Sequence, residues 1–172
     1  MKKKGDWFQW AGPGLLVLFL DRIVKWIHLM ISGERIPGLA DFELDFSNPL
    51  KGFLEVSGLY QRQTVRNTGM AFGLFQGNST LILIVSLLLL AACFFLLRKS
   101  RPTGLAPIAL SMMAGGAAGN MIDRLLHGYV IDMFPFFGWF VFNVADVGVV
   151  AGAILCGWSL LFRPQDWSKK KQ

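Results

Sequence analysis

The sequence has few charged residues for its size, and this shortage excludes an ordinary water-soluble protein. Charged residues make up 16% of the 172 positions, whereas a water-soluble domain carries roughly 25%. Hydrophobic residues make up 53%, which indicates that lipid surrounds most of the chain. The length is that of one domain. We therefore expect residues 1–172 to form a single membrane-embedded domain.

Cysteine and histidine are also scarce, and their placement does not indicate a metal site. Cys93 and Cys156 stand singly in long apolar runs, where small buried or lipid-facing side chains are the simpler interpretation. His28 and His127 lie far apart, without the spacing of metal ligands. We therefore expect no metal site and no disulfide.

The N-terminal apolar run lacks the cleavage site of a secretory signal peptide. It follows a lysine-rich start at residues 1–4, as signal peptides do, but no small-residue motif ends it. Its far end instead carries Asp21, Arg22 and Lys25. We interpret this run as a first helix that the mature protein retains.

Four apolar segments are long enough to cross a bilayer, which takes about 20 residues. The segments cover approximately residues 10–31, 80–97, 105–122 and 139–162. Residues 81–97 contain no charged side chain, and the polar pair Asn78-Ser79 before them can cap a helix. The fold class predicted is an α-helical integral membrane protein with four transmembrane helices.

Basic residues predict the orientation of these helices. Ten of the 17 lysines and arginines lie in three short segments, at residues 2–4, 98–101 and 163–171. Because cytoplasmic loops carry the excess of positive charge, both termini are expected in the cytoplasm. The net charge of +6 does not indicate a nucleic-acid partner, because the basic residues flank apolar spans.

The long loop at residues 33–78, expected outside the cell, has the pattern of short strands. Residues 42–46, 54–56 and 64–66 alternate between apolar and polar side chains, and turn-forming residues separate them. This pattern predicts a small antiparallel sheet between the first and second helices, lying on the outer membrane surface.

Ionisable residues in or near the spans are costly in lipid, so each calls for an explanation. On the predicted topology they all lie toward the outer half, which suggests one polar site that opens outward. They are Asp21, Arg22, Lys25, Asp123, Arg124, Asp132 and Asp146.

Several of these residues have simpler explanations. Asp21 and Lys25 are spaced as an ion pair within one helix, and they either form only that pair or support the outer site. Asp123 can pair with Arg124 or a neighbour. The small residues at 115–119 allow close packing of helices in a membrane. That explanation does not extend to Asn120, whose amide is expected at the depth of the aspartates.

Asp146 is the most informative residue, because the predicted fourth helix places it about two turns inside an apolar segment. Asn143 lies one turn before it, on the same face. A second carboxyl sharing its proton would relieve the cost of burying Asp146. Such a pair can activate water to attack an amide and then protonate the leaving amine.

At this point the sequence resembles the lipoprotein signal peptidases, or signal peptidase II, a family of bacterial enzymes. The resemblance rests on five motifs in a fixed order, placed on the four predicted spans. The motifs are Asp21-x-x-x-Lys25, Asn67-Thr68-Gly69-x-Ala71-Phe72, Gly115-Gly116-x-x-Gly119-Asn120-x-x-Asp123-Arg124, Gly128-x-Val130-x-Asp132 and Phe142-Asn143-x-Ala145-Asp146.

The resemblance implies an aspartic endopeptidase of the cell membrane that cuts the signal peptide from diacylglyceryl-modified prolipoproteins, just before the lipidated cysteine. It implies Asp132 and Asp146 as the catalytic pair, a sheet that cradles the substrate, and contact with bilayer lipid. It implies no metal or organic cofactor, and we expect a monomer. The residues implied for substrate binding or support of the pair are Asp21, Lys25, Asn67, Gly69, Asn120, Arg124 and Asn143.

The sequence departs from the family pattern near the pair, where Met133 replaces an expected aromatic residue and the segment from Asp132 to Asp146 is short. Two other functions remain possible from composition alone. Paired carboxylates can form the relay of an ion or proton transporter, although the second span has no polar relay group. The acids can also serve only to hold helices together in a structural membrane protein.

Overall fold

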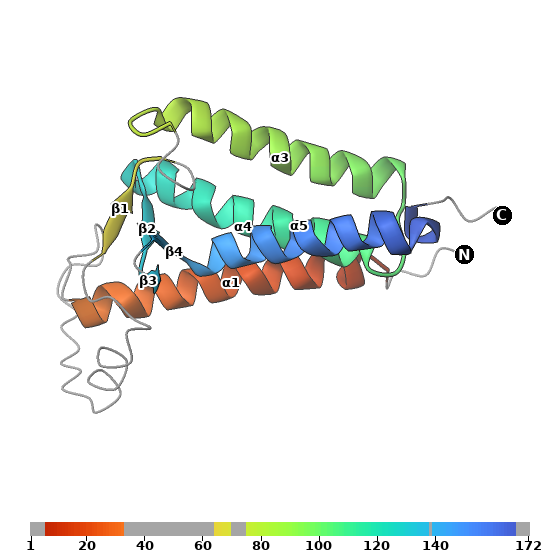
Figure 1. Cartoon of the computed structure of the whole chain (residues 1–172), viewed down its shortest axis with the longest axis horizontal. Coiled ribbons are helices and arrows are strands. Elements are labelled where there is room, and N and C mark those ends of the chain that lie inside the picture. Colours follow the sequence, from red (N-terminus) through yellow and green to blue (C-terminus); the bar gives the residue numbers. More distant parts are fainter. Residues whose placement is uncertain (1–5, 33–63, 70–74, 138, 168–172) are drawn as a thin grey trace.

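Four long helices lie side by side in the computed structural model, which describes residues 6–32, 64–69, 75–137 and 139–167. Successive helices run in opposite directions (Figure 1). A short 3-10 helix, η2 (Pro164–Trp167), follows the last of them. The helices are α1 (Asp6–Ser32), α3 (Ser79–Lys99), α4 (Ala106–His127) and α5 (Val144–Phe162).

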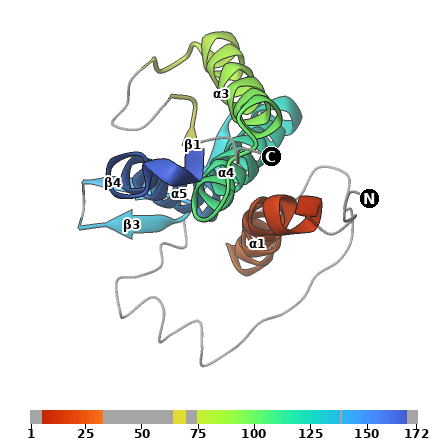
Figure 2. The ribbon, with the colours of Figure 1, turned by 90° about the vertical axis from the view of Figure 1, so that its right-hand side faces the viewer.

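Helix α4 occupies the centre of the bundle, with the other three helices around it (Figure 2). It buries eleven residues, most of them alanine, glycine or other small side chains. Helix α3 buries Ile82 and Cys93, which makes it more peripheral. Leu88 on α3 and Ile154 and Leu161 on α5 are 63%, 66% and 76% exposed. Such apolar outer surfaces fit a lipid environment.

Glycines allow α1 and α5 to pack directly against the backbone of α4. A Cβ added to Gly115 would collide with the carbonyl oxygen of Gly14 in α1. A Cβ added to Gly116 would collide with the carbonyl oxygen of Ala145 in α5. Because lipid provides no hydrophobic force between helices, this close approach supplies the packing energy. It also fixes the start of α5 against α4.

Two pairs of short strands lie together at one end of the bundle (Figure 1). Strand β1 (Val65–Asn67) pairs antiparallel with β2 (Val130–Asp132), so that Val65 is opposite Asp132. Strands β3 (Phe134–Phe136) and β4 (Phe140–Phe142) form an antiparallel hairpin between β2 and α5. The end of the bundle therefore joins segments from both of the predicted outer loops.

The small antiparallel sheet is confirmed in part. The predicted strand at residues 64–66 corresponds to β1, but its partner is β2, from the segment between the third and fourth helices. The predicted strands at residues 42–46 and 54–56 lie outside the described residues. Strand pairing depends on contacts between distant segments, so the alternating pattern predicted a strand but not its partner.

The fourth helix begins later than predicted. The sequence predicts its start near residue 139, but α5 starts at Val144, because residues 140–142 form β4 and Asn143 caps the helix. Asp146 therefore lies in the first turn of α5, not two turns inside it. The third helix extends beyond the predicted end at residue 122 and stops at Gly128, whose φ of 80° is readily adopted by glycine.

By length and hydropathy, two helices of the described chain qualify as membrane spans, α3 and α5. Helices α1 and α4 carry the charged residues near the strands, including Asp21 and Asp123. The helical architecture with small antiparallel sheets is thus confirmed. The number of helices that cross the membrane remains a prediction.

The opposite end of the bundle is closed by the carboxylate of Asp166, which is 3% exposed. It accepts hydrogen bonds from the backbone N–H of Leu105, at 3.0 Å, and from the hydroxyl of Ser159, at 3.3 Å. The Asp166 carbonyl accepts another from the N–H of Thr103, at 2.8 Å. This contact ties the turn between α3 and α4 to the end of α5.

The packing of α4 against α5 can be tested by changing each of two glycines to alanine in separate variants. Gly116→Ala places a Cβ against the Ala145 backbone, so we expect a loss of about 1–3 kcal/mol in stability. Gly157→Ala, on α5, meets no atom within 4 Å and should leave stability unchanged or slightly raised. Thermal unfolding in detergent measures both, and equal midpoints for the two variants would contradict the packing argument.

Candidate functional site

Asp132 and Asp146 reach the same end of the bundle from different elements. Asp132 is the last residue of β2, and Asp146 lies in the first turn of α5. Asp132 is 1% exposed, whereas Asp146 is only half-buried. Solvent or a ligand can therefore approach the pair more readily from the Asp146 side.

Two asparagines hold the carboxylate of Asp132. Asn67, at the end of β1, donates from Nδ2 to Oδ2 at 2.9 Å. Asn143 donates from Nδ2 to Oδ1 at 2.6 Å. The antiparallel pairing of β1 with β2 brings Asn67 to this position. Both oxygens of Asp132 thus accept a hydrogen bond from a neutral amide.

The carboxylate of Asp146 is held by the start of its own helix and by α4. Its Oδ2 accepts from the backbone N–H of Asn143 at 3.2 Å, and Asn143 Oδ1 accepts from the N–H of Asp146 at 2.9 Å. This reciprocal pair is a capping box, which satisfies free N–H groups at a helix start. Asn120 in α4 donates from Nδ2 to Oδ1 of Asp146 at 2.7 Å.

Asn143 connects the two carboxylates. Besides its bond to Asp132, its Nδ2 donates to Oδ1 of Asn120 at 3.1 Å, and Asn120 in turn donates to Asp146. The two N–H bonds of the amide are both used. Asn143 is fully buried, and rotating the amide would place its oxygen against a carboxylate. The orientation of this amide is therefore determined by its neighbours.

Burial, and after it the negative charge of Asp146, raise the pKa of Asp132 to about 7. Hydrogen bonds from Asn67 and Asn143, and the charge of Lys25, oppose the shift. Because burial disfavours the charged form of a carboxyl, the loss of solvation outweighs these bonds. Asp132 can therefore bind or release a proton near neutral pH.

Four charged residues form a second cluster beside the pair, here called the charged cluster: Asp21, Arg22, Lys25 and Asp123. Lys25 lies 3.0 Å from the carboxylate of Asp21 and 2.6 Å from that of Asp123. Arg22 lies 2.5 Å and 2.6 Å from the same two carboxylates. Two positive and two negative groups balance, as buried charges require. The predicted Asp21–Lys25 ion pair is present.

The charged cluster also holds the backbone directly before each aspartate of the pair. The N–H of Ala145, one residue before Asp146, donates to Asp21 at 3.0 Å. The N–H of Ile131, one residue before Asp132, donates to Asp123 at 3.1 Å. The cluster thus positions both aspartates through one peptide unit each.

Arg124 ties the segment after β1 to α4. Its Nη2 donates to the carbonyl oxygen of Gly69 at 2.8 Å, and its Nη1 donates to that of Asn120 at 3.4 Å. The side chain of Asn67 accepts from the N–H of Gly69 at 2.9 Å. Arg124 and Gly69 therefore support Asn67, which bonds to Asp132, and Asn120, which bonds to Asp146.

The structure brings all nine residues predicted for the site to one end of the bundle, from three helices and two strands and the residues next to them. Two further residues, Arg22 and Asp123, were not predicted as site residues, although their cost in an apolar segment was a signal. Asp123 pairs with Arg22 and Lys25 of α1, not with Arg124. Among the described residues, no group of three or more histidines, cysteines and acids could hold a metal ion.

Comparison with known proteins agrees with this geometry. Residues 14–162 match the family described as "Signal peptidase (SPase) II". A lipoprotein signal peptidase of Syntrophomonas wolfei is 39% identical over 145 residues, which is 84% of this chain and 87% of the relative. One of Pelotomaculum thermopropionicum is 39% identical over 162 residues, or 91% and 93%.

A solved structure is also similar. It is described as "Bacterial membrane enzyme structure by the in meso method at 2.3 A resolution". The match covers 100% of this chain and 98% of the chain of the solved structure, with a TM-score of 0.69 and 26% sequence identity. The family match covers most of the chain, and the relatives align over most of their own lengths. The chain therefore belongs to the signal peptidase II family of membrane peptidases.

Proposed function

We propose that Asp132 and Asp146 are the catalytic pair of an aspartic endopeptidase. On this proposal the enzyme removes the signal peptide from diacylglyceryl-modified prolipoproteins, cutting before the lipidated cysteine. The family match and the relatives' name, lipoprotein signal peptidase, support the activity. One observation supports the choice of residues: Asn143 bonds to both carboxylates, which come from different elements.

The proposed chemistry needs one proton on the pair. One carboxylate takes a proton from water, and the water oxygen attacks the carbonyl carbon of the scissile bond. The protonated partner donates to the carbonyl oxygen. The tetrahedral intermediate then collapses: one hydroxyl returns its proton to the unprotonated carboxylate as the C=O bond re-forms, the C–N bond breaks, and the leaving nitrogen takes a proton from the other carboxyl. The pair again holds one proton. The proton belongs to the pair as a unit, so it is not assigned to one aspartate.

The other polar residues act as positioning residues in this scheme. Asn67, Asn120 and Asn143 orient the two carboxylates through the bonds described above. Asp21 and Lys25 hold the helix start that carries Asp146. Arg124 and Gly69 hold the segment after β1. The scheme uses no metal or organic cofactor, because the carboxyls themselves supply the base and the acid.

The membrane placement that suits this chemistry has all four helices spanning the bilayer and the pair near the extracytoplasmic face. Arg98 and Lys99 in the last turn of α3, and Arg163 after α5, lie at the opposite end from the strands. The excess of positive charge marks that end as cytoplasmic. Residues 1–172 act as one domain and one monomer in this proposal.

The substrate in this proposal enters sideways from the bilayer, with its signal helix beside the four helices and its diacylglyceryl chains in lipid. The lipid chains then hold the scissile bond at the depth of Asp132 and Asp146. Such positioning by remote parts of a substrate contributes to the rate without touching the reacting atoms.

The roles of the two aspartates predict the effect of removing either carboxyl. Asp132→Asn and Asp146→Asn should each lower kcat by at least about a hundredfold, because neither amide can act as base or acid. Asp166→Asn makes the same change at a buried carboxylate at the far end of the bundle, and should retain turnover. Cleavage of a lipid-modified prolipoprotein in detergent measures all three, with unfolding curves to show that the variants fold. Near-normal cleavage by either Asp132→Asn or Asp146→Asn would contradict the assignment of these residues as the catalytic pair.

The raised pKa of Asp132 predicts the pH dependence of kcat/KM. Because the pKa of Asp132 is raised to about 7, the pair loses its shared proton as the pH rises through about 7. Because the pair needs one proton, kcat/KM should fall on the alkaline side of this pH. The folded-state pKa is above the unfolded value of roughly 3.9, so the stability contributed by the protonated form is also lost as the pH rises toward 7.

Asn67 offers a direct test of the cause of this limb. Its hydrogen bond lowers the pKa of Asp132, so Asn67→Leu should move the alkaline limb to higher pH by about one unit. Thr68→Val changes the exposed neighbour and should leave the limb in place. An unshifted limb in Asn67→Leu would show that another group controls it.

A further inference from the structure

The hairpin of β3 and β4 connects the two halves of the proposed catalytic pair. It occupies residues 134–142, between Asp132 at the end of β2 and Asn143 at the start of α5. Six of its nine residues are aromatic, and none is charged. The Trp139 indole N–H is its sole polar side-chain group. Such a composition is unusual for a hairpin in water.

Both faces of the hairpin are apolar. The register places Phe134 opposite Phe142 and Phe136 opposite Phe140, so four phenylalanines share one face. Their rings lie in contact, with centroids 5.6 Å apart for the first pair and 5.0 Å for the second. The other face carries Pro135 opposite Val141. A sheet with one face in water alternates apolar and polar residues, and this one does not.

Exposure increases from the base of the hairpin to its tip. Phe134 and Phe142, next to the proposed catalytic pair, are half-buried. Phe137 and Trp139 at the tip are 86% and 84% exposed. A two-stranded hairpin is marginally stable on its own in water. The tip therefore needs an apolar environment beyond what the bundle supplies.

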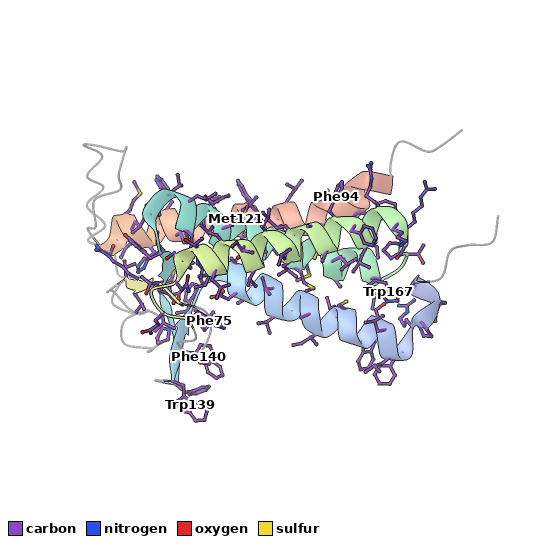
Figure 3. All side chains as sticks on the ribbon, turned by 90° about the horizontal axis from the view of Figure 1, so that it is seen from above. Phe75, Phe94, Met121, Trp139, Phe140 and Trp167 are labelled. Atoms are coloured by element: carbon purple, nitrogen blue, oxygen red, sulfur yellow. The ribbon has the colours of Figure 1, made fainter. Side chains whose placement is uncertain are left out.

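The hairpin projects sideways from the bundle, beyond α5 and away from α1 (Figure 2). Figure 3 shows Trp139 at the point farthest from the helices, with Phe140 between it and the bundle. The hairpin ends where α5 begins, and the first turns of α5 present exposed apolar residues such as Val147 and Val150. A helix that spans the membrane ends at the interface, where aromatic side chains are favoured.

We infer that the tip of the β3–β4 hairpin inserts into the interface of the lipid bilayer beside α5 and so sets the depth of Asp132 and Asn143 relative to the lipid surface. The occupant of the apolar surface is bilayer lipid. A surface for the substrate's lipid chains is expected next to the pair, whereas the most exposed aromatics are at the far end of the hairpin. The apolar outer surface of α5 continues directly into the hairpin.

The consequence for catalysis rests on the proposed function. Since the hairpin is joined to Asp132 at one end and to Asn143 at the other, its anchoring holds both residues at one depth. A substrate that is itself anchored by lipid chains presents its scissile bond at a fixed depth. A change in the depth of the enzyme's pair would therefore misplace the pair with respect to that bond.

The depth of the tip can be measured with a nitroxide label, independently of activity. The label is attached at Trp139→Cys, in a Cys93→Ala/Cys156→Ala background, with the full chain in vesicles of phosphatidylethanolamine and phosphatidylglycerol. Oxygen concentrates in lipid and a nickel chelate stays in water, so their collision rates with the label report its depth. Labels at Gln76→Cys and Ile154→Cys, both at exposed residues, give references at a polar turn and on the outer surface of α5.

We expect the label at residue 139 to collide more with oxygen and less with the nickel chelate than the label at residue 76. Equal nickel access at residues 139 and 76 would overturn the inference. So would protection that develops only when lipidated substrate binds, because the occupant would then be the substrate. Spin–spin coupling between labels at residue 139 would also overturn it, since it would place a second copy of the chain there.

A second measurement tests the catalytic consequence. The double variant Phe137→Ser/Trp139→Ser should lower kcat/KM in proteoliposomes by about tenfold through misplacement of the pair. Leu126→Ser makes an apolar-to-serine change at an exposed position of α4 and should keep normal turnover. An unchanged kcat/KM in a folded double variant would overturn the depth-setting role. If Asp132→Asn remained active, the proposed function would fail while the depth measurement at residue 139 stood.

Discussion

The arrangement of the two aspartates depends on the hydrogen bonds of one buried residue, Asn143. It caps the start of α5 together with Asp146, and it bonds to the carboxylate of Asp132 on a separate strand. One residue thus links the start of a helix to the end of a strand. Because its N–H bonds and its oxygen all have partners, the two carboxylates cannot shift independently. Asn143 bonds to both carboxyls through neutral N–H groups, so it adds no positive charge to offset the burial and the charge of Asp146 that raise the pKa of Asp132.

The charged cluster fixes the backbone that carries the two aspartates. Asp21 and Asp123 each use a carboxylate oxygen to hold the peptide before one aspartate of the pair. Arg22 and Lys25 balance their charge within the bundle. A buried ion pair adds little net stability, because losing solvation offsets the attraction. Its contribution here is positional, since it links α1 to α4, α5 and β2 at one place.

The close packing runs along the bundle, whereas the polar side chains of the site gather at one end. Glycines along α4 let α1 and α5 approach closely, and Asp166 closes the end away from the strands. The polar network collects at the other end, where the aromatic hairpin projects from the bundle (Figure 3). Exposed apolar surfaces and the polar site are therefore adjacent, as the proposed cleavage of membrane-anchored substrates requires.

The sequence by itself determined the helical class and the apolar segments, and it pointed to nine site residues that the structure brings together, because polar groups in apolar segments are costly and the motifs resemble one family. Local signals could not place the start of α5, since residues 140–142 are as apolar as the helix that follows. They also could not show that β1 pairs with β2, or that Asp123 pairs across helices with Lys25. These features depend on contacts between segments far apart in the chain. The tertiary structure alone decided them, because strand pairing and ion pairing are set by which groups folding brings within bonding distance.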